Sequence, residues 1–299
     1  MRVRVSPWAP NKHMKKLVLV LLLAMSSLAS AKTISVIIPF SAGGPTDHLW
    51  RSIEPSMNER LKKHGITLIT ENVPGAGGVI AGNKIAETSD RALLGFFSPA
   101  LAIAPGMNPA AVRYSDSTIK LIGYAGETEM FVVSKLSTEK FLKKCQSEPL
   151  FFGHSNIGST SHLLGLVVGK ELKCKELVHV PYKGLAPAYI DLFAGRIDYL
   201  VDFAINAESQ ISSGAVNKIF TMDDKFSNRL ENWHVFISNN IDDPDIRLIE
   251  KEFYELKKDK LFVDKLEKSL RIKNFAIVRD NDWLIKEFKS YKTFVEKVK

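Results

Sequence analysis

Strand-like and helix-like patterns alternate along most of this chain, and this alternation constrains its fold more than any other feature. Short apolar runs such as Ile34–Ile38 and Ala92–Phe97 are typical of buried strands, and helical periodicity such as that of Thr46–Lys63 separates them. Further strands are predicted at Ile66–Thr70, Leu121–Tyr124, Met130–Val133, Leu150–Phe152, Leu177–Val180 and Asp198–Phe203. Further helices are predicted at Val79–Glu87, Thr138–Lys144, Ser161–Leu172, Pro187–Ala194 and Ile205–Ser212. This order indicates an α/β protein with mainly parallel sheets.

The chain beyond Phe236 is mostly helical by pattern. Helices are predicted at Asp245–Lys257, Lys260–Leu270 and Asn281–Val298, with one short strand at Asn274–Val278. A length of 299 residues corresponds to about two domains of ordinary size. Because no Pro- or Gly-rich linker separates two halves, we expect strands near Phe131–Ser134 and Lys218–Met222 to cross between them.

The start of the chain has the features of an export signal. Met14-Lys15-Lys16 precedes the apolar run Leu17–Ala24, and small residues follow up to Ala29-Ser30-Ala31. A basic start, a short apolar core and an Ala-x-Ala end are typical of a cleavable signal peptide, and the run is too short to span a bilayer comfortably. We therefore predict that residues 14–31 are a signal peptide cleaved after Ala31, and that the mature protein is periplasmic. Residues 1–13 would then precede the true start at Met14.

The net charge of +8 suggests a nucleic-acid partner, but the leader carries much of it. Residues 1–31 contribute +5 and the rest +3, with lysines and acids alternating along stretches such as 250–260. That is the pattern of a solvated surface, so no nucleic-acid partner is expected. The histidines are scattered in the sequence without metal-ligand spacing, so neither a metal site nor a cofactor is predicted.

The loop Pro39–Asp47 is rich in glycine and leads from the first strand into a helix. Its candidate ligand contacts are Ser41, Ala42, Gly43, Gly44, Thr46 and Asp47. Thr46 suits a helix N-cap, and the free N–H groups and positive dipole end of a helix start favour an anion. A plain strand-to-helix turn explains this loop equally well.

The loop Phe152–His162 also follows a strand and opens a helix. Its candidate ligand contacts are His154, Ser155, Gly158, Ser159 and Thr160. The Gly-x-Ser-x-x-Gly spacing around Ser155 is one residue longer than that of a hydrolase nucleophile elbow. An exported serine hydrolase that uses Ser155 is therefore the alternative to a binding function, with His179 or His234 as its base.

Three other strand ends carry possible contacts. The glycines of 75–78 allow the backbone either to contact a ligand closely or to make a tight turn under the first loop. Tyr182 offers an aromatic wall with a hydroxyl, whereas Lys183 is expected to face solvent. Asp202 either binds a ligand ammonium or hydroxyl group or caps the next helix.

Taken together and in order, these loops resemble the pattern of one family. Its motifs are P-F-x-x-G-G-x-x-D, E-N-x-P-G-A-G-G, Y-G-S-S-G-x-G-S-x-x-H, H-V-P-Y-K-G and D-x-x-x-D. They correspond here to Pro39–Asp47, Glu71–Gly78, Phe152–His162, His179–Gly184 and Asp198–Asp202. From about Lys32 onward, the chain is therefore similar to the substrate-binding proteins of tripartite tricarboxylate transporters.

The resemblance implies a type II periplasmic-binding-protein fold, with two α/β lobes and a ligand cleft at the hinge. Lobe 1 would comprise residues 32–133 and 222–299, and lobe 2 residues 134–221. The implied protein is a monomeric receptor and not an enzyme, and it delivers its ligand to membrane permease subunits. The ligand would be a small carboxylate: a di- or tricarboxylic acid, an acidic amino acid or an aromatic acid. Backbone amides would do most of the binding, and Ser98 joins the implied contacts.

The sequence also departs from the family pattern in four places. His154 stands where the family has a small Ser, and Ile157 replaces a polar residue. His48 and Trp50 follow the first loop, where small apolar residues are usual. The segment 223–232 is shorter than usual, so its part in shaping the cleft is open. These departures leave the identity of the ligand open.

Two cysteines follow helices in what the pattern predicts to be one β-α-β unit. Cys145 precedes the strand Leu150–Phe152, and Cys174 precedes the strand Leu177–Val180. If these strands are neighbours, both cysteines lie at the same amino-terminal edge of the sheet, and strands about 4.8 Å apart bring them within disulfide range. In an oxidising compartment we therefore predict a Cys145–Cys174 disulfide that stabilises one lobe.

Overall fold

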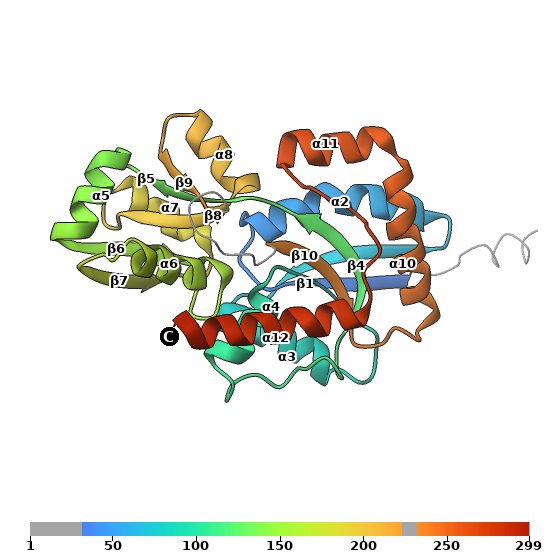
Figure 1. Cartoon of the computed structure of the whole chain (residues 1–299). Coiled ribbons are helices and arrows are strands. Elements are labelled where there is room, and N and C mark those ends of the chain that lie inside the picture. The colour runs from blue at the N-terminus through green and yellow to red at the C-terminus, as the bar shows by residue number, and fades with distance from the viewer. Residues whose placement is uncertain (1–31, 223–231, 299) are drawn as a thin grey trace, which may run out of the picture.

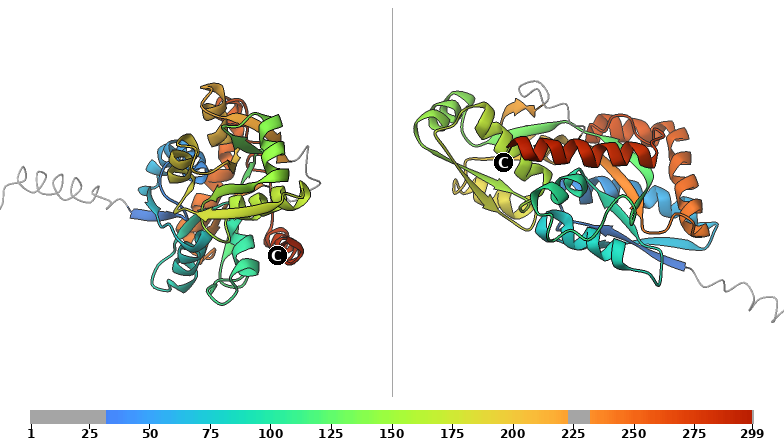
Figure 2. Two further views of the ribbon diagram at one scale, coloured as in Figure 1. Left: turned by 90° about the vertical axis from the view of Figure 1, so that its left-hand side faces the viewer. Right: turned by 60° about the horizontal axis from the view of Figure 1, so that its bottom comes forward.

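Two five-stranded sheets, each covered by helices, form the two lobes of the molecule (Figure 1). The computed structural model describes residues 32–222 and 232–298. The strand order is β2-β1-β3-β10-β4 in the first sheet and β7-β6-β8-β5-β9 in the second. The two-lobed α/β architecture predicted from the sequence is thus confirmed, and the two further views show the same division (Figure 2).

The first lobe is built on β1 and its parallel neighbours β2 and β3, with β10 antiparallel between β3 and β4. Its strands are β1 (Lys32–Ile38), β2 (Ile66–Asn72), β3 (Leu94–Phe97), β4 (Lys120–Glu127) and β10 (Trp233–Ser238). Its helices are α2 (Pro45–Lys62), α3 (Val79–Glu87), α4 (Ala100–Met107), α10 (Pro244–Glu255), α11 (Lys260–Leu270) and α12 (Asn281–Val298), with short 3-10 turns η1 (Ala76–Gly78) and η2 (Leu256–Lys258).

The second lobe is built on β6, which pairs in parallel with β7 and β8, while β5 runs antiparallel between β8 and β9. Its strands are β5 (Met130–Ser134), β6 (Pro149–His154), β7 (Glu176–Pro181), β8 (Tyr199–Phe203) and β9 (Asn217–Thr221). Its helices are α5 (Thr138–Ser147), α6 (Thr160–Glu171), α7 (Leu185–Phe193) and α8 (Ala204–Ser212). Both sheets therefore mix parallel and antiparallel pairs.

The division between the lobes differs from the sequence expectation at one strand. Residues 130–133 were assigned to the first lobe, but β5 pairs with β8 and β9 in the second sheet. The chain thus leaves the first sheet after Glu127 and enters the second at Met130. The remaining boundaries of the predicted lobes stay a prediction, and residues 1–31 and 223–231, including the predicted leader, lie outside the described part.

Two local predictions also need correction. The predicted strand Asn274–Val278 is wrong: Asn274 and Ala276 have φ angles of 58° and 51°, which no extended strand accommodates. Only an isolated bridge between Glu127 and Lys273 forms next to this segment. Helix α4 was missed, because its sequence ALAIAPGM is apolar all round and contains Pro105, so it lacks the polar face that marks an amphipathic helix.

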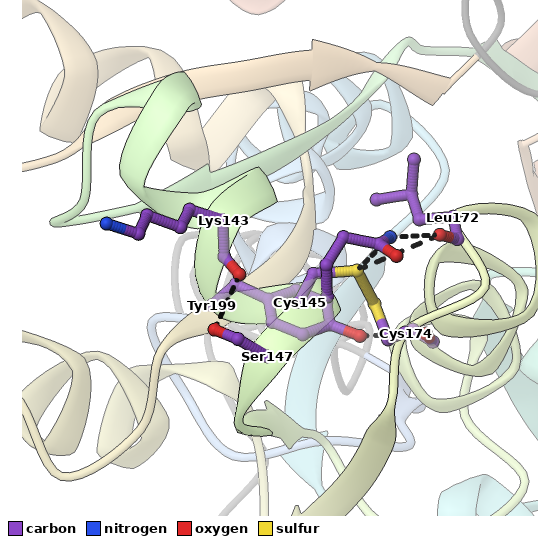
Figure 3. The surroundings of a disulfide bond; sticks show 8 residues. Lys143, Cys145, Ser147, Leu172, Cys174 and Tyr199 are labelled. Atoms are coloured by element: carbon purple, nitrogen blue, oxygen red, sulfur yellow. Dashed lines mark hydrogen bonds between the residues drawn. A yellow bond between two sulfur atoms is a disulfide. The ribbon is translucent and has the colours of Figure 1, made fainter.

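The predicted disulfide joins Cys145 and Cys174 at the edge of the second sheet (Figure 3). The two Cα atoms are 4.6 Å apart. The pairing of Leu150 with Leu177 in parallel strands β6 and β7 places both preceding loops at the same sheet edge. The backbone N–H of Lys175 also donates to the carbonyl oxygen of Cys145, at 2.8 Å, so the two loops are joined by main chain as well.

Helix α12 belongs to the first lobe but reaches the second. It packs mainly against α4, and its carboxyl-terminal end lies beside α6 (Figures 1 and 2). There the ammonium of Lys170 donates to the carbonyl oxygen of Lys297, at 2.5 Å. Within residues 32–222 and 232–298, none of the helices combines the length and the apolar character that a membrane span needs.

Candidate functional site

A small pocket lies between the two lobes, where loops from both sheets meet. Both lobes contribute apolar and hydroxyl-bearing residues to its lining: Phe40, Gly44, Pro45, Thr46, Ser98, Ser155, Thr160, Ser161, Leu185 and Phe203. The space that the centre of a water molecule can reach is about 20 Å³. That is room for about one water molecule, so the lobes are closed around the pocket in this conformation.

The amino terminus of α2 forms one wall of the pocket. Its N-cap is Gly44, and the predicted N-cap Thr46 lies inside the helix. No side chain caps this end, so the first-turn N–H groups are left for another acceptor. Thr46 is buried, and its Oγ1 lies 3.4 Å from Nε2 of His234 on β10. Gly44 and Thr46 therefore lie where the sequence pattern placed an anion seat, with the positive end of the helix dipole towards the pocket.

Asp47 lies in the same helix turn, but its carboxylate does not line the pocket. It accepts hydrogen bonds from the backbone N–H of Gly43, the amide of Asn72 and the guanidinium of Arg51. Burial opposes the ionised form, but these hydrogen bonds outweigh it and hold the pKa of Asp47 below its ordinary value. Its role in the structure is to hold the Ser41–Gly44 turn to β2 and α2.

The amino terminus of α6 forms the opposite wall. Ser159 is its N-cap, and its Oγ accepts from the backbone N–H of His162 at 3.2 Å. Ser161 Oγ accepts from the backbone N–H of Ser155 at 3.0 Å and lies 2.9 Å from the hydroxyl oxygen of Ser155. This chain of serines fixes the shape of the loop that closes over the pocket.

Thr160 stands out among the pocket hydroxyls. It is 3% exposed, and its Oγ1 has no hydrogen-bond partner among the described residues. An unpartnered buried hydroxyl costs stability, so it marks a place where a bound molecule would supply the missing hydrogen bond. Ser98, which is 1% exposed at the start of α4, faces the same pocket.

Two contacts between the lobes close the rim of the pocket. The hydroxyl of Ser41 donates to the carbonyl oxygen of Lys183, at 2.8 Å. Gly77 lies against the loop of the other lobe so tightly that a Cβ atom there would be 2.3 Å from the carbonyl oxygen of Ile157. The glycine-rich loop is therefore a close approach between the lobes, and its residues do not line this pocket.

The other candidate residues lie outside the pocket lining. Ala42 and Gly43 form the turn before α2, and Gly158, with a φ angle of 84°, lies in the turn before α6. The Tyr182 hydroxyl donates to Asp191 at 2.7 Å; burial, followed by the adjacent carboxylate, raises the pKa of Tyr182 to about 12. Lys183 is exposed, as expected.

Asp202 was a candidate for binding a ligand hydroxyl or ammonium group, but its carboxylate is turned away from the pocket. It accepts from Tyr189, Asn206 and the backbone N–H of Phe203. Burial raises the pKa of Asp202 to about 6, although these three donors lower it. The alternative, a cap on the next helix, is also wrong, because Phe203 is the N-cap of α8 and no side chain caps that end.

The structure corrects the expectation that the histidines are scattered. His154, His162 and His179 lie together on the second lobe, with ligand nitrogens all within 4.8 Å of one another. Burial and the neighbouring imidazoles lower the pKa of His154 to about 3 and of His162 to about 4. His154, a candidate ligand contact, thus points to this cluster and does not line the pocket.

Sequence reasoning missed half of the pocket lining. The missed residues are Phe40, Pro45, Ser161, Leu185 and Phe203. Four of them directly precede or follow a candidate residue, so the loops themselves were the available signal. Leu185 carried no sequence signal, because an apolar residue at a helix start is usually core.

Two α/β lobes with a small pocket of mixed apolar and hydroxyl lining between their helix termini define the class of two-lobed binding proteins. Within that class, the chain belongs to the tripartite tricarboxylate transporter family receptors, whose sequence model matches residues 50–235. That match begins inside α2 and ends inside β10, so it includes the amino terminus of α6 at the pocket but not that of α2.

Curated relatives have similar sequences over part of their length. A UPF0065 protein from the TAR-I ttuE-ttuC' intergenic region of Agrobacterium vitis is 28% identical over 192 residues, which are 62% of this chain and 54% of that protein. Protein BugT of Bordetella pertussis is 28% identical over 178 residues, covering 56% of this chain and 53% of BugT. The matched part of the chain thus spans about half the length of these relatives.

Solved structures share the fold over nearly the whole chain. The periplasmic binding protein BugD has a TM-score of 0.76 and 24% identity, covering 89% of this chain and 96% of its own. MatC from Rhodopseudomonas palustris with bound malate has a TM-score of 0.72 and 20% identity, covering 89% and 98%. The R. palustris protein Rpa4515 with adipate has a TM-score of 0.76 and 18% identity, covering 90% and 97%. At these identities the likeness shows the periplasmic-binding-protein fold.

Proposed function

We propose that this protein is an exported receptor that captures a small carboxylate between its lobes and delivers it to the permease subunits of a tripartite tricarboxylate transporter. Family membership and the two-lobed fold support a solute-binding role. The predicted leader supports export, although it lies outside the described residues. N-terminal sequencing of the secreted form tests this part: a first residue other than Lys32 would contradict the predicted cleavage site.

The observation that carries the proposal is the buried, unpartnered hydroxyl of Thr160 in a pocket between two helix amino termini. Backbone N–H groups and hydroxyls donate hydrogen bonds to an anion at little ordering cost, since they are already held by the fold. A carboxylate in this pocket would accept from the first turns of α2 and α6 and from Thr160.

The lining also narrows the ligand class. Among the described residues that line the pocket there is no acidic and no basic side chain. An amino acid would leave its ammonium without a carboxylate, because Asp202 and Asp47 are bonded elsewhere. A tricarboxylate would bring three negative charges into a pocket whose lining has no basic side chain to balance them. The pocket thus suits a mono- or dicarboxylate with a short apolar body, the class to which malate and adipate of the two R. palustris structures belong.

Ligand entry requires the lobes to separate. The pocket in this conformation has room for about one water molecule, which is too little for a dicarboxylate. The Ser41–Lys183 hydrogen bond and the Gly77–Ile157 contact would therefore open as the ligand enters and form again around it.

A serine hydrolase is the second candidate, because Ser155 lines the pocket. The hydroxyl of Ser155 lies 2.9 Å from Ser161 Oγ, which is a hydroxyl and not an imidazole base. His154 beside it contacts His179 instead. Without a base at the hydroxyl, the geometry supports a binding role for Ser155.

Calorimetric titration of the purified chain with separate carboxylates tests the proposal. The set comprises malate, succinate, adipate, benzoate, aspartate, glutamate and citrate. We expect saturable binding of a mono- or dicarboxylate, and weaker binding of the amino acids and of citrate. Thr160→Val, which keeps the shape but removes the hydroxyl, should weaken binding about tenfold, the value of one good hydrogen bond.

Thr67→Val on the exposed face of β2 is the matched control and should bind like the wild type. Equal affinity in the Thr160 variant would contradict the placement of the ligand. Turnover of an ester panel that is lost in Ser155→Ala would favour the hydrolase.

A further inference from the structure

Three histidines from different elements meet on the second lobe. His154 ends β6, His162 lies in the first turn of α6, and His179 lies on β7. Their ring centroids are 4.3 Å apart for His154 and His162, 5.3 Å for His154 and His179, and 5.2 Å for His162 and His179. Each ring therefore lies next to the other two.

The nitrogen atoms have the spacing that a metal ion needs. Two imidazole nitrogens on a tetrahedral ion with bonds of about 2.0–2.1 Å lie roughly 3.3 Å apart. Nε2 of His154 is 3.1 Å from Nδ1 of His179. The ligand nitrogens of all three rings lie within 4.8 Å of one another, so small ring rotations would bring the third to the same ion.

The surroundings of the rings differ in a way that suits a bound ion. His154 is completely buried, and its Nδ1 has no hydrogen-bond partner among the described residues. Its other nitrogen, Nε2, lies against another imidazole, that of His179. His179, in contrast, is exposed, so an ion could enter from solvent and keep a water on its open side.

We propose that His154, His162 and His179 form a binding site for a divalent transition-metal ion of the imidazole-preferring class, represented by Zn²⁺. Three imidazoles without a carboxylate are a poor site for Mg²⁺ or Ca²⁺, which prefer oxygen ligands. Three nitrogens with an open fourth position match the common three-histidine arrangement of Zn²⁺. His154 and His162 flank the Ser155–Ser161 loop, so the ion would hold both ends of that loop.

A stack of aromatic rings is the competing explanation for this cluster. Phe152 lies 5.4 Å from the ring of His154, 6.3 Å from that of His162 and 6.2 Å from that of His179. Packing against Phe152 accounts for rings that are near one another. The 3.1 Å contact between the two nitrogens also has the length of an imidazole–imidazole hydrogen bond, so metal titration is needed to separate the two explanations.

Titration of the chain with Zn²⁺, and separately with Co²⁺, tests the site. The chain is produced without a histidine tag and stripped of metal with EDTA. We expect one Zn²⁺ per chain and, with Co²⁺, the intense visible absorption of a tetrahedral ion. Absence of saturable Zn²⁺ binding, or binding only at several weak sites, would overturn the proposal and leave the aromatic stack.

Variants locate the ion. Replacing His154, His162 or His179 by Ala should each weaken Zn²⁺ binding by at least about 100-fold, more than the loss of an outer-shell partner. His48→Ala, an exposed histidine on α2, is the control and should bind Zn²⁺ like the wild type. His179 is exposed, so its variant should fold even where a buried variant does not. Unchanged Zn²⁺ affinity in folded His179→Ala would overturn the assignment.

Discussion

A Cβ atom on Gly77 of the first lobe would lie 2.3 Å from the carbonyl oxygen of Ile157 in the second. The same position has a φ angle of 65°, which side chains rarely adopt. Glycine is therefore required twice here, once for its own conformation and once for the approach of the other lobe. A side chain at this position would therefore have two separate effects: the strained φ angle would lower the stability of the fold, and the clash with Ile157 would hinder closure of the lobes.

Gly77→Ala should weaken ligand binding by more than tenfold, because the closed state can no longer form without a shift of the backbone. Gly65→Ala is the matched control: its φ angle is 68°, and nothing lies within 4 Å of the added Cβ. Both variants carry a conformational cost of about 1–2 kcal/mol, so their midpoints of denaturation should fall alike. Calorimetry with the ligand identified for the wild type measures the difference. Equal affinities in the two variants would contradict the closure argument.

The disulfide should contribute to stability and not to binding. It closes a loop with a sequence separation of 29, for which the chain-entropy model gives about 3–4 kcal/mol. The double variant Cys145→Ala/Cys174→Ala should thus lose roughly that free energy of unfolding while its ligand affinity stays unchanged. Denaturation in guanidinium measures the free energy of unfolding. Thiol counting on the unreduced wild type tests the disulfide itself. Two titratable thiols in the wild type would contradict the bond.

His234 should make stability depend on pH. Burial lowers the pKa of His234 to about 3, whereas an unfolded histidine titrates near 6.5. Below about pH 6.5 the unfolded state takes up a proton that the folded state excludes. The free energy of unfolding therefore decreases as the pH is lowered, by up to about 1.4 kcal/mol per pH unit. His234→Phe keeps the ring next to Phe96 and Phe203 without this titration.

The wild type should therefore lose stability relative to His234→Phe as the pH falls from about 6.5 towards 4. Urea denaturation of both proteins at a series of pH values gives the difference in the free energy of unfolding. A difference that is constant over this range would show that the folded protein protonates His234 as readily as the unfolded one.

The carboxylate of Asp47 should stabilise the Ser41–Gly44 turn at the pocket. Its carboxylate is 2% exposed and accepts from Gly43, Arg51 and Asn72. Asp47→Ala leaves these donors without their acceptor and should cost roughly 2–4 kcal/mol of stability. Asp116→Ala, at an exposed position, is the control and should be neutral. Thermal denaturation compares the two, and equal melting temperatures would contradict this role.

The sequence predicts the alternation of the elements well because the strands are short apolar runs, such as Val36–Ile38, between glycine-rich turns. It fails where that contrast is absent. Helix α4 has no polar face, and the segment around Asn274 has extended-looking composition but left-handed backbone angles. The conformation of both segments depends on tertiary packing and not on the local sequence pattern.

In the candidate site, too, the sequence predicts local features but not those that depend on tertiary packing. The helix starts at Gly44 and Thr160 are local features, and the sequence finds them. The direction of the Asp202 carboxylate depends on Tyr189 and Asn206, whose positions are set by packing. The histidine cluster joins β6, α6 and β7, so sequence spacing could not reveal it.

The contact between Lys170 of α6 and Lys297 at the end of α12 provides a natural position for an optical reporter. One residue belongs to a helix of the second lobe, and the other to a helix anchored on the first. A donor dye near one and an acceptor dye near the other would change their energy transfer whenever the lobes part. The protein thus offers a ready layout for a fluorescent biosensor, with both labelled positions outside the pocket lining.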